Sequence, residues 1–246
     1  MLDRFHASLR HWLRLLGGTT PGAHVLERPG VTGSVFPAAP ERSVVNSVVF
    51  DDAAALAAAY DDFAAAYDEI GAAWTVWARP GHAEAVALLE SKGHVLDAAP
   101  EAMARDLRQP PPRPTDLDDW TAAGDIAEVG PINDVAYAFG TDSFARAFRG
   151  MSPEAFRVYL ASVDGRPCAS TTTVDLDGNC EVTMVAVLPE ARGRGLAGKL
   201  IAHALADAAE RGMETSTLAA TEMGRPTYER LGYEARGPVG MWELRR

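Results

Sequence analysis

The chain has 246 residues, of which 47% are hydrophobic, and its 34 acidic residues against 23 lysines and arginines give a formal net charge of −11. This length provides for one large or two small hydrophobic cores, since domains commonly hold roughly 100–200 residues. The charge argues against a nucleic-acid partner, which needs a basic surface to displace counterions from phosphates, and it is explained by a solvated acidic surface or, alternatively, by a cationic substrate.

The N-terminal segment carries a helical pattern. Apolar residues recur at helical spacing from Leu2 to Leu16 with basic residues between them, which predicts an amphipathic helix that ends at Gly17-Gly18. Such a helix can lie on an anionic membrane surface, but docking of its apolar face on the protein is commoner. No stretch reaches the ~18 consecutive apolar residues of a membrane span, and no secretion signal precedes it, so we expect a cytoplasmic protein without stable membrane association.

Helix and strand signals then alternate up to a proline-rich segment. They predict a hairpin at 24–36, a strand at 43–50, a helix at 56–70 capped near Asp51-Asp52, a strand at 74–78, a helix at 84–92 and a strand at 94–107. Residues 108–114 contain four prolines and form a stiff, extended linker. We therefore expect a first domain over 1–109, a linker over 110–115 and a second domain over 116–246.

The second half begins with a predicted helix at 117–138 and a short helix or loop at 140–150. Strands at 158–162, 167–174 and 180–187 are joined by Asp-Gly turns, a helix runs from 196 to Gly212, and a strand at 215–219 precedes a short helix and the last strands. The turn at Asp177-Gly178 pairs Cys180 with Asp175 and leaves Cys168 far along the hairpin. We therefore expect no disulfide, and neither cysteine has the neighbours of a metal site.

The segment from Arg192 to Ala197 connects a strand directly to a helix. The start of a helix exposes backbone N–H groups and the positive end of the helix dipole, which favour an anion such as a pyrophosphate. Gly193 and Gly195 let the backbone approach the phosphates closely. Arg192 and Arg194 add positive charge, although either is equally typical of a solvent-facing loop. The segment therefore predicts a phosphate site.

Together with Tyr228-Glu229-Arg230-Leu231-Gly232-Tyr233, this loop resembles the GNAT superfamily of N-acetyltransferases, whose signature is Arg/Gln-x-x-Gly-x-Gly/Ala and then Tyr-x-x-x-Gly-Phe/Tyr. The resemblance covers about residues 116–246. It implies an α/β (α+β) fold with a mixed, mostly antiparallel sheet flanked by helices, and acetyl-CoA as co-substrate. It also implies two sets of cofactor-binding backbone groups: Val185, Ala186 and Val187 along the pantetheine arm, and Arg192, Gly193, Arg194, Gly195, Leu196 and Ala197 at the pyrophosphate.

By the same resemblance Tyr228 is the general acid. The departing CoA thiolate needs a proton, which a phenol of pKa about 10 can supply within hydrogen-bond reach. The alternative is a tyrosine that packs on the sheet. An ammonium acceptor with a pKa of about 10.4 must also lose a proton, and we name Glu222 as the candidate base. Glu181, Asp134 and a chain of water molecules remain alternatives.

The first half resembles a degenerate copy of the second. Residues 88–94 align with 227–233, and each segment follows a helix and a strand. Asp51-Asp52 stands in place of the glycine-rich loop and Leu89 in place of Tyr228, so we expect no cofactor site there. The arrangement is similar to a tandem GNAT pair of the mycothiol synthase type, with chance similarity of helix-glycine-strand segments as the alternative.

The sequence thus predicts an enzyme that moves acetyl from acetyl-CoA to a primary amine by direct attack, without a metal. The acceptor is a small-molecule amine, or a peptide N-terminus or lysine. The alternatives are a non-catalytic acyl-CoA sensor or interaction module, and a transferase that uses a longer acyl-CoA. The sequence does not identify the acceptor, and it leaves open whether the chain forms a homodimer.

Overall fold

The computed structural model describes residues 1–117 and 119–245 and arranges them in two sheets with flanking helices. The strands of the first sheet are β1 (His24–Arg28), β2 (Val31–Val35), β3 (Ser47–Phe50), β4 (Trp74–Ala78), β5 (Val95–Ala98) and β13 (Gly240–Leu244). Those of the second sheet are β6 (Glu101–Asp106), β7 (Trp120–Thr121), β8 (Arg157–Val163), β9 (Arg166–Leu176), β10 (Asn179–Val187), β11 (Thr215–Ala220) and β12 (Glu234–Pro238).

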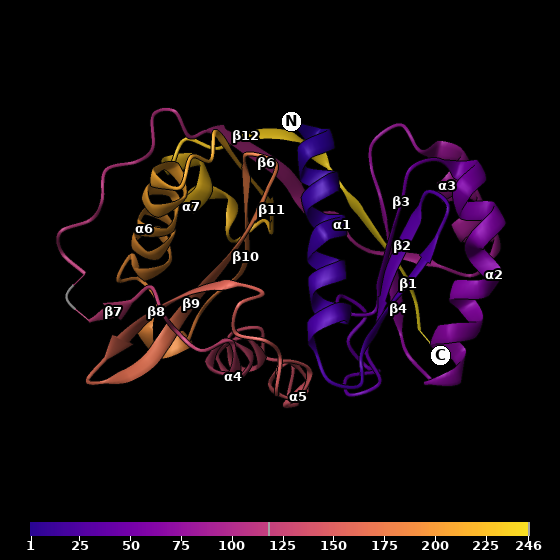
Figure 1. Ribbon diagram of the computed structural model, residues 1–246, viewed down its shortest axis with the longest axis horizontal. Helices are drawn as coiled ribbons and strands as arrows, with labels where there is room; N and C mark the ends of the chain where they lie inside the picture. Colours follow the sequence, from indigo (N-terminus) through magenta and orange to yellow (C-terminus); the bar gives the residue numbers. More distant parts are fainter. Residues whose placement is uncertain (118, 246) are drawn as a thin grey trace.

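The helices cover the faces of these sheets. They are α1 (Leu2–Thr19), α2 (Ala53–Glu69), α3 (Ala83–Ser91), α4 (Ile126–Ala136), α5 (Ser143–Ala147), a 3₁₀ turn η1 (Pro189–Ala191), α6 (Leu196–Glu210) and α7 (Arg225–Arg230). In Figure 1, α1 stands between the two sheets, α2 covers the outer face of the first sheet and α6 covers the outer face of the second.

Each sheet contains one parallel pair among antiparallel neighbours. The first sheet has the strand order β1-β2-β3-β4-β13-β5, with β3 parallel to β4. The second has the order β12-β6-β11-β10-β9-β8-β7, with β10 parallel to β11. In both, a helix connects the two parallel strands, as parallel pairing requires. The predicted mixed, mostly antiparallel sheet with flanking helices is confirmed.

The two sheets exchange their last strands. β6 precedes the proline-rich linker, yet it lies in the second sheet between β11 and β12, while the C-terminal β13 lies in the first sheet between β4 and β5. Figure 1 shows these two connections crossing behind α1. The division of the chain at residues 110–115 therefore does not coincide with the division between the sheets, because one strand from each side crosses over.

The first helix joins the two sheets into one body. Its apolar side chains are buried, among them Phe5, Leu9, Trp12 and Leu13, so its apolar face is docked on the protein. The helix continues through Gly17, where a Cβ would lie 2.6 Å from the His24 carbonyl oxygen, instead of ending there as predicted. No helix within the described residues is long and apolar enough to cross a membrane.

Three other sequence predictions need correction. The helix predicted at 117–138 begins only at Ile126, because Asp125 caps it and forms a capping box with Glu128, and β7 precedes it. The strand predicted at 43–50 begins at Ser47, after hydrogen-bonded turns. The strand predicted at 94–107 is interrupted near Pro100 and becomes β5 and β6, which belong to different sheets.

Candidate functional site

The parallel strands β10 and β11 separate in the middle of the second sheet. They pair from Asn179 to Glu181 on β10 and from Thr215 to Thr217 on β11, and β10 then continues to Val187 beside β9 alone. The edge of β10 that faces β11 is therefore open beyond Glu181. Two cavities lie along this strand, one lined by its residues from Glu181 to Val185 and the other by Val187.

A β-bulge bends β10 where its edge is open. The register with β9 shifts between Thr183 and Ala186, and Met184 has a φ of 50°. Side chains of β9 bond to the displaced carbonyls: Ser170 Oγ donates to Met184 O at 3.1 Å, and Thr172 Oγ1 donates to Thr183 O at 3.1 Å. Because these hydroxyls satisfy the hydrogen bonding of the two carbonyls, they stabilise the bulge.

The loop after β10 has the conformation that its glycines permit. Gly193 and Gly195 have φ values of 78° and 73°, which disfavour other residues. A Cβ at Gly193 would meet no atom within 4 Å, so the space in front of the loop is open. In the described part of the chain, the backbone amides from Gly195 to Gly198 make no backbone hydrogen bond. These amides at the start of α6 fit an anion such as a pyrophosphate.

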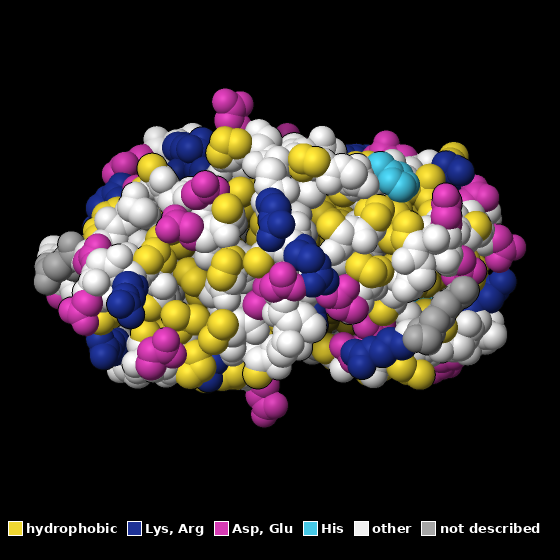
Figure 2. Space-filling model, turned by 90° about the horizontal axis from the view of Figure 1, so that it is seen from below, with side chains coloured by type: hydrophobic (Ala, Val, Ile, Leu, Met, Phe, Trp, Pro, Cys, Tyr) yellow, Lys and Arg dark blue, Asp and Glu magenta, His cyan; other side chains and the backbone are white. Residues whose placement is uncertain are grey.

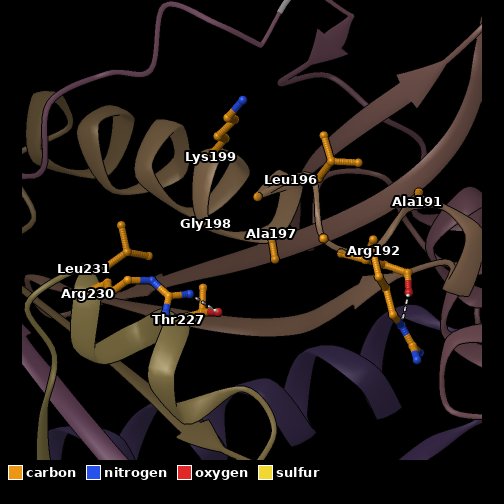
Figure 3. Close-up of a pocket in the computed structure, with 12 residues that line it drawn as sticks. Ala191, Arg192, Leu196, Ala197, Gly198, Lys199, Thr227, Arg230 and Leu231 are labelled. Atoms are coloured by element: carbon orange, nitrogen blue, oxygen red, sulfur yellow. Dashed lines mark hydrogen bonds between the residues drawn. The ribbon is translucent and has the colours of Figure 1, made fainter.

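The first cavity, of about 520 Å³, lies at this loop. Of the predicted loop residues, Arg192, Gly193, Gly195, Leu196 and Ala197 line it, and Arg194 does not. Figure 3 shows Lys199 and Arg230 at its rim, two cations that the sequence reasoning missed. Lys199 pairs with Asp116 at 2.8 Å. Arg230 donates to Thr227 Oγ1 at 3.2 Å and has no carboxylate partner among the residues described.

Arg192 is positioned differently from the sequence prediction. Its guanidinium donates to Ala136 O at 2.6 Å and to Val187 O at 3.3 Å, and Figure 3 shows it turned away from Lys199. Its backbone amide bonds to Pro189 O. Arg192 therefore joins the end of α4 to the end of β10. The amides without a backbone partner extend to Gly198, one residue beyond the predicted segment.

The second cavity, of about 360 Å³, lies between the two sheets. Its lining includes Tyr228 and Glu181 from the second sheet and its helices, and Phe5, Leu9 and Trp12 from α1. Four acidic residues, Glu41, Asp97, Glu181 and Glu243, share the lining with two arginines, Arg42 and Arg245. The cavity is therefore aromatic and carries an excess of carboxylates.

Tyr228 is held on α7 with its side chain buried, 8% exposed, against the second sheet. Burial raises its pKa, and the neighbouring Tyr137 raises it further. The hydroxyl of Tyr228 makes no hydrogen bond to any other described residue, although the residue lines the second cavity. The group thus stays protonated at neutral pH and is free to donate.

Tyr137 was missed by the sequence reasoning. Its hydroxyl donates to Val185 O at 2.9 Å, so it contacts one of the three backbone positions predicted to meet the pantetheine arm. Of the other two predicted positions, Val187 lines the first cavity, and Ala186 is buried and pairs with Ser170 on β9.

Glu181 and not Glu222 lies in the second cavity. The carboxylate of Glu181 is buried, which raises its pKa to about 8, while a hydrogen bond from Thr217 lowers it. Glu222 is exposed and lines neither of these cavities. Asp134 accepts from the amides of Phe144 and Ala145 at 3.0 Å and so holds α5. No group of three metal-ligating side chains was found in residues 1–117 and 119–245.

The equivalent place in the first sheet is closed. Asp52 is the N-cap of α2 and accepts from the amide of Ala55 at 2.8 Å, and Asp51 pairs with Arg10 at 2.7 Å. Leu89, aligned with Tyr228, is fully buried. Both carboxylates thus serve the fold, and their charge opposes binding of an anion at this helix start.

Comparison with known proteins agrees with this geometry. Residues 154–235 match the family model described as an acetyltransferase (GNAT) domain, and GNAT domains use acetyl-CoA. A search of curated proteins gave no match.

Solved structures extend the similarity to nearly the whole chain. A GCN5-related N-acetyltransferase from Kribbella flavida is 20% identical with a TM-score of 0.66, and the match covers 97% of this chain and 94% of that one. A tandem GNAT protein from the clavulanic acid biosynthesis pathway is 14% identical with a TM-score of 0.58, over 97% and 94% of the two chains. A GCN5-related N-acetyltransferase from Sphaerobacter thermophilus is 19% identical with a TM-score of 0.58, over 90% and 75%. At these identities the likeness shows the fold, which is that of GNAT proteins.

Proposed function

We propose that this protein transfers the acetyl group of acetyl-CoA to a primary amine, with the cofactor along β10 and the amine in the cavity between the sheets. The observation that carries the proposal is the order of groups along this one strand. The free amides from Gly195 to Gly198 lie at its end, its open edge follows, and Glu181 and Tyr228 lie in the cavity beside it.

The cofactor would be held by its phosphates and its arm. The amides at the start of α6 would bind the pyrophosphate, with Arg230 adding positive charge at the rim, where Lys199 is paired with Asp116. The open edge of β10 offers backbone groups near Val185 and Val187 to the amides of the pantetheine arm, as an added strand would pair there. The thioester would then reach the second cavity, where Tyr228 lies.

The chemistry needs three proton transfers. The amine nitrogen attacks the thioester carbonyl, the carbon–sulfur bond breaks, and the departing thiolate takes a proton from the Tyr228 hydroxyl. A buried phenol with a raised pKa is a weak acid, but the same desolvated surroundings raise the proton affinity of the thiolate. The free hydroxyl of Tyr228 is therefore the available donor in this cavity.

We assign the proton-accepting role to Glu181 in preference to Glu222. Glu181 lines the same cavity as Tyr228, and its pKa of about 8 makes it a much stronger base than an ordinary carboxylate. Glu222 is exposed and lies outside this cavity. An acceptor ammonium with a pKa near 10 would lose one proton to Glu181 before its nitrogen attacks, and the proton that the nitrogen sheds on becoming an amide would return to the Tyr228 phenolate.

The first half of the chain acts in this proposal as a cofactor-free GNAT-like partner that closes the acceptor cavity. Its helix α1 and its residues Trp77 and Asp97 form one wall. The excess of carboxylates in the lining favours a cationic acceptor. Figure 2 shows acidic and basic side chains interspersed on the face of the molecule that is seen from below.

Turnover of acetyl-CoA with a panel of amines, measured as free CoA, tests the proposal. Tyr228→Phe should lower kcat by about 10²–10⁴-fold with little change in acetyl-CoA affinity, because only the proton is removed. Tyr67→Phe is the matched control, since its buried hydroxyl bonds to Ser34 O and Ser47 O in the first sheet, away from the cavity. Full kcat in Tyr228→Phe would show that Tyr228 only packs.

The base assignment is tested in the same assay. Glu181→Gln should remove most of the amine-dependent turnover, and Glu222→Gln should leave it unchanged. Loss of turnover in Glu222→Gln with unchanged turnover in Glu181→Gln would instead identify Glu222 as the base. Release of CoA with none of the amines, together with tight acetyl-CoA binding, would instead indicate a sensor.

A further inference from the structure

A series of buried hydrogen bonds leads from the first helix to the carboxylate of Glu181. Its members are, in order, Arg4, Thr215, Asn179, Thr217 and Glu181, and we call it the Arg4–Glu181 network. Arg4 lies 2.8 Å from Thr215 Oγ1, and Thr215 lies 2.8 Å from Asn179 Oδ1. Asn179 Nδ2 lies 2.7 Å from Thr217 Oγ1, which bonds in turn to Glu181 Oε2.

The network follows from the pairing of the two parallel strands. Asn179 is opposite Thr215 and Glu181 is opposite Thr217, at the last positions where β10 and β11 pair. Because side chains alternate along a strand, residues two apart lie on the same face, and here that face meets α1. Asn179 and Thr217 are 1% and 0% exposed, so water cannot replace their hydrogen bonds.

The direction of every bond in the network is fixed by its first member. A guanidinium only donates, so the Thr215 hydroxyl accepts from Arg4 and keeps its proton for another acceptor. Asn179 Oδ1 takes it at 2.8 Å, since the Gly178 carbonyl lies farther away, at 3.5 Å.

The amide of Asn179 is thereby oriented. Its two N–H groups point to Ser8 Oγ at 2.9 Å and Thr217 Oγ1 at 2.7 Å. Thr217 accepts from Asn179, so its own proton is directed at Glu181. Each donor therefore points toward the carboxylate, and the series begins at a positive charge on α1.

We propose that the Arg4–Glu181 network positions Glu181 and stabilises its charged form, so that Asn179, Thr217 and the N-terminal helix are positioning residues for proton acceptance. This inference rests on the proposed function of Glu181 as the base. Hydrogen bonds to a carboxylate favour its ionised form, and a buried carboxylate has no water to supply them. The first half of the chain would thus tune the reaction, besides closing the cavity.

The neighbours of Glu181 keep their charge states over the range in which it titrates. Burial raises the pKa of Tyr137, Tyr228, Tyr233 and Cys180, so these groups remain neutral near pH 8. The charged residues of the cavity are Glu41, Asp97 and Glu243 with Arg42 and Arg245, and Arg245 pairs with Asp97 and Glu243. A change at Thr217 therefore acts on Glu181 directly.

The test is the titration of the Glu181 carboxyl in the full chain, followed by NMR of ¹³C-labelled glutamate and assigned by loss of the signal in Glu181→Gln. Thr217→Val should raise the Glu181 pKa by about one unit, because the ionised carboxylate loses a hydrogen bond that water cannot replace in this buried place. At pH 7 the ionised fraction, and with it kcat/KM, should fall about tenfold. Thr217→Ser keeps the hydroxyl and should restore both values.

Two further variants separate the network from general effects. Thr75→Val removes a buried hydroxyl that has no described partner in the first sheet, and it should leave the Glu181 titration unchanged. Arg4→Met, at the half-buried start of the network, should shift the pKa in the same direction by a smaller amount, and it serves if Thr217→Val does not fold.

An unchanged Glu181 pKa in the folded Thr217→Val or Arg4→Met variant would overturn the inference, and so would an equal shift in Thr217→Ser. The titration needs no turnover. A shifted carboxyl in a protein that acetylates none of the amines would therefore keep the network and refute the proposed function.

Discussion

The junction between β3 and α2 and the junction between β10 and α6 occupy equivalent places in the two sheets, since each follows the first strand of the parallel pair. In the first junction only Asp51 and Asp52 separate strand from helix, and the Asp52 side chain bonds to an amide of the helix start. In the second, eight residues from Leu188 to Gly195 intervene, two of them glycines with positive φ, and the amides remain free.

The strands that precede the two junctions, β3 and β10, also differ in how far they pair with their parallel neighbours. β3 pairs with β4 up to Val49, one residue before it ends, whereas β10 leaves β11 six residues before its own end. Under the proposed function, the same order of elements would thus provide an anion site only where the loop has room, the helix start is uncapped and the strand edge is open. A cap that stabilises a helix removes the donors that a phosphate would use.

The largest expected effect is on the second junction. Gly195→Glu should weaken acetyl-CoA binding at least about 100-fold, because the new side chain strains a backbone with positive φ and brings a negative charge to the helix start. Isothermal calorimetry measures it. Gly22→Glu is the matched control: Gly22 has a φ of 79° and open space around it, but it lies outside the loop. Near-normal affinity in folded Gly195→Glu would contradict the loop assignment.

The buried carboxyl of Glu181 should make the stability of the protein depend on pH. Burial raises the folded-state pKa of Glu181 from 4.5 to about 8, so the folded protein binds this proton more tightly than the unfolded chain. Its contribution to stability is complete below pH 4.5 and is lost as the pH rises toward 8. Between pH 6 and pH 8 the wild-type protein should lose about 2 to 3 kcal/mol of unfolding free energy relative to Glu181→Gln.

Urea denaturation of both proteins across this range measures that difference. A constant difference between wild type and Glu181→Gln from pH 6 to pH 8 would mean that Glu181 titrates normally. Asp51→Asn serves as the control at the first junction, because Asp51 is half-exposed and its pair with Arg10 is worth little at the surface.

At the first junction a smaller effect is expected. Asp52→Ala should lower the free energy of unfolding by about 1 kcal/mol through loss of the helix cap, and it should leave acetyl-CoA affinity unchanged. Asp125→Ala, which removes the cap of α4, should cost a similar amount and shows the size of a cap effect in this protein. Weakened acetyl-CoA binding in Asp52→Ala would indicate a cofactor role for the first junction.

Local chemistry made much of the fold predictable from sequence. The Asp-Gly turns, whose residues all have positive φ, fixed the hairpins and placed Cys180 opposite Asp175, as expected. The glycine-rich loop was found because its spacing and its place after a strand are local. The exchange of β6 and β13 could not be predicted. The strand pairs β5–β6 and β12–β13 each divide between the two sheets, at Pro100 and at Val239, and the partners of these strands are set by contacts distant in sequence.

The site was predicted less completely than the fold. The pattern of α1 predicted its apolar face, but Arg4 and Ser8 gave no sign that they meet β10 and β11. The sequence named Glu181 among several acidic residues, and its burial and its place in the second cavity distinguish it from Glu222. Lys199 and Tyr137 lie outside the motifs and Arg230 occupies a variable position of one, so no motif predicts that these residues lie at the cavities.

The stoichiometry of CoA binding tests the difference between the two junctions most directly. Calorimetric titration of the full chain with acetyl-CoA should saturate at one molecule per chain, and Gly195→Glu should weaken that site at least about 100-fold. Two molecules per chain, or a single site that survives Gly195→Glu, would contradict the account, because it places one site at the start of α6 and none at the start of α2, where Asp51 and Asp52 lie.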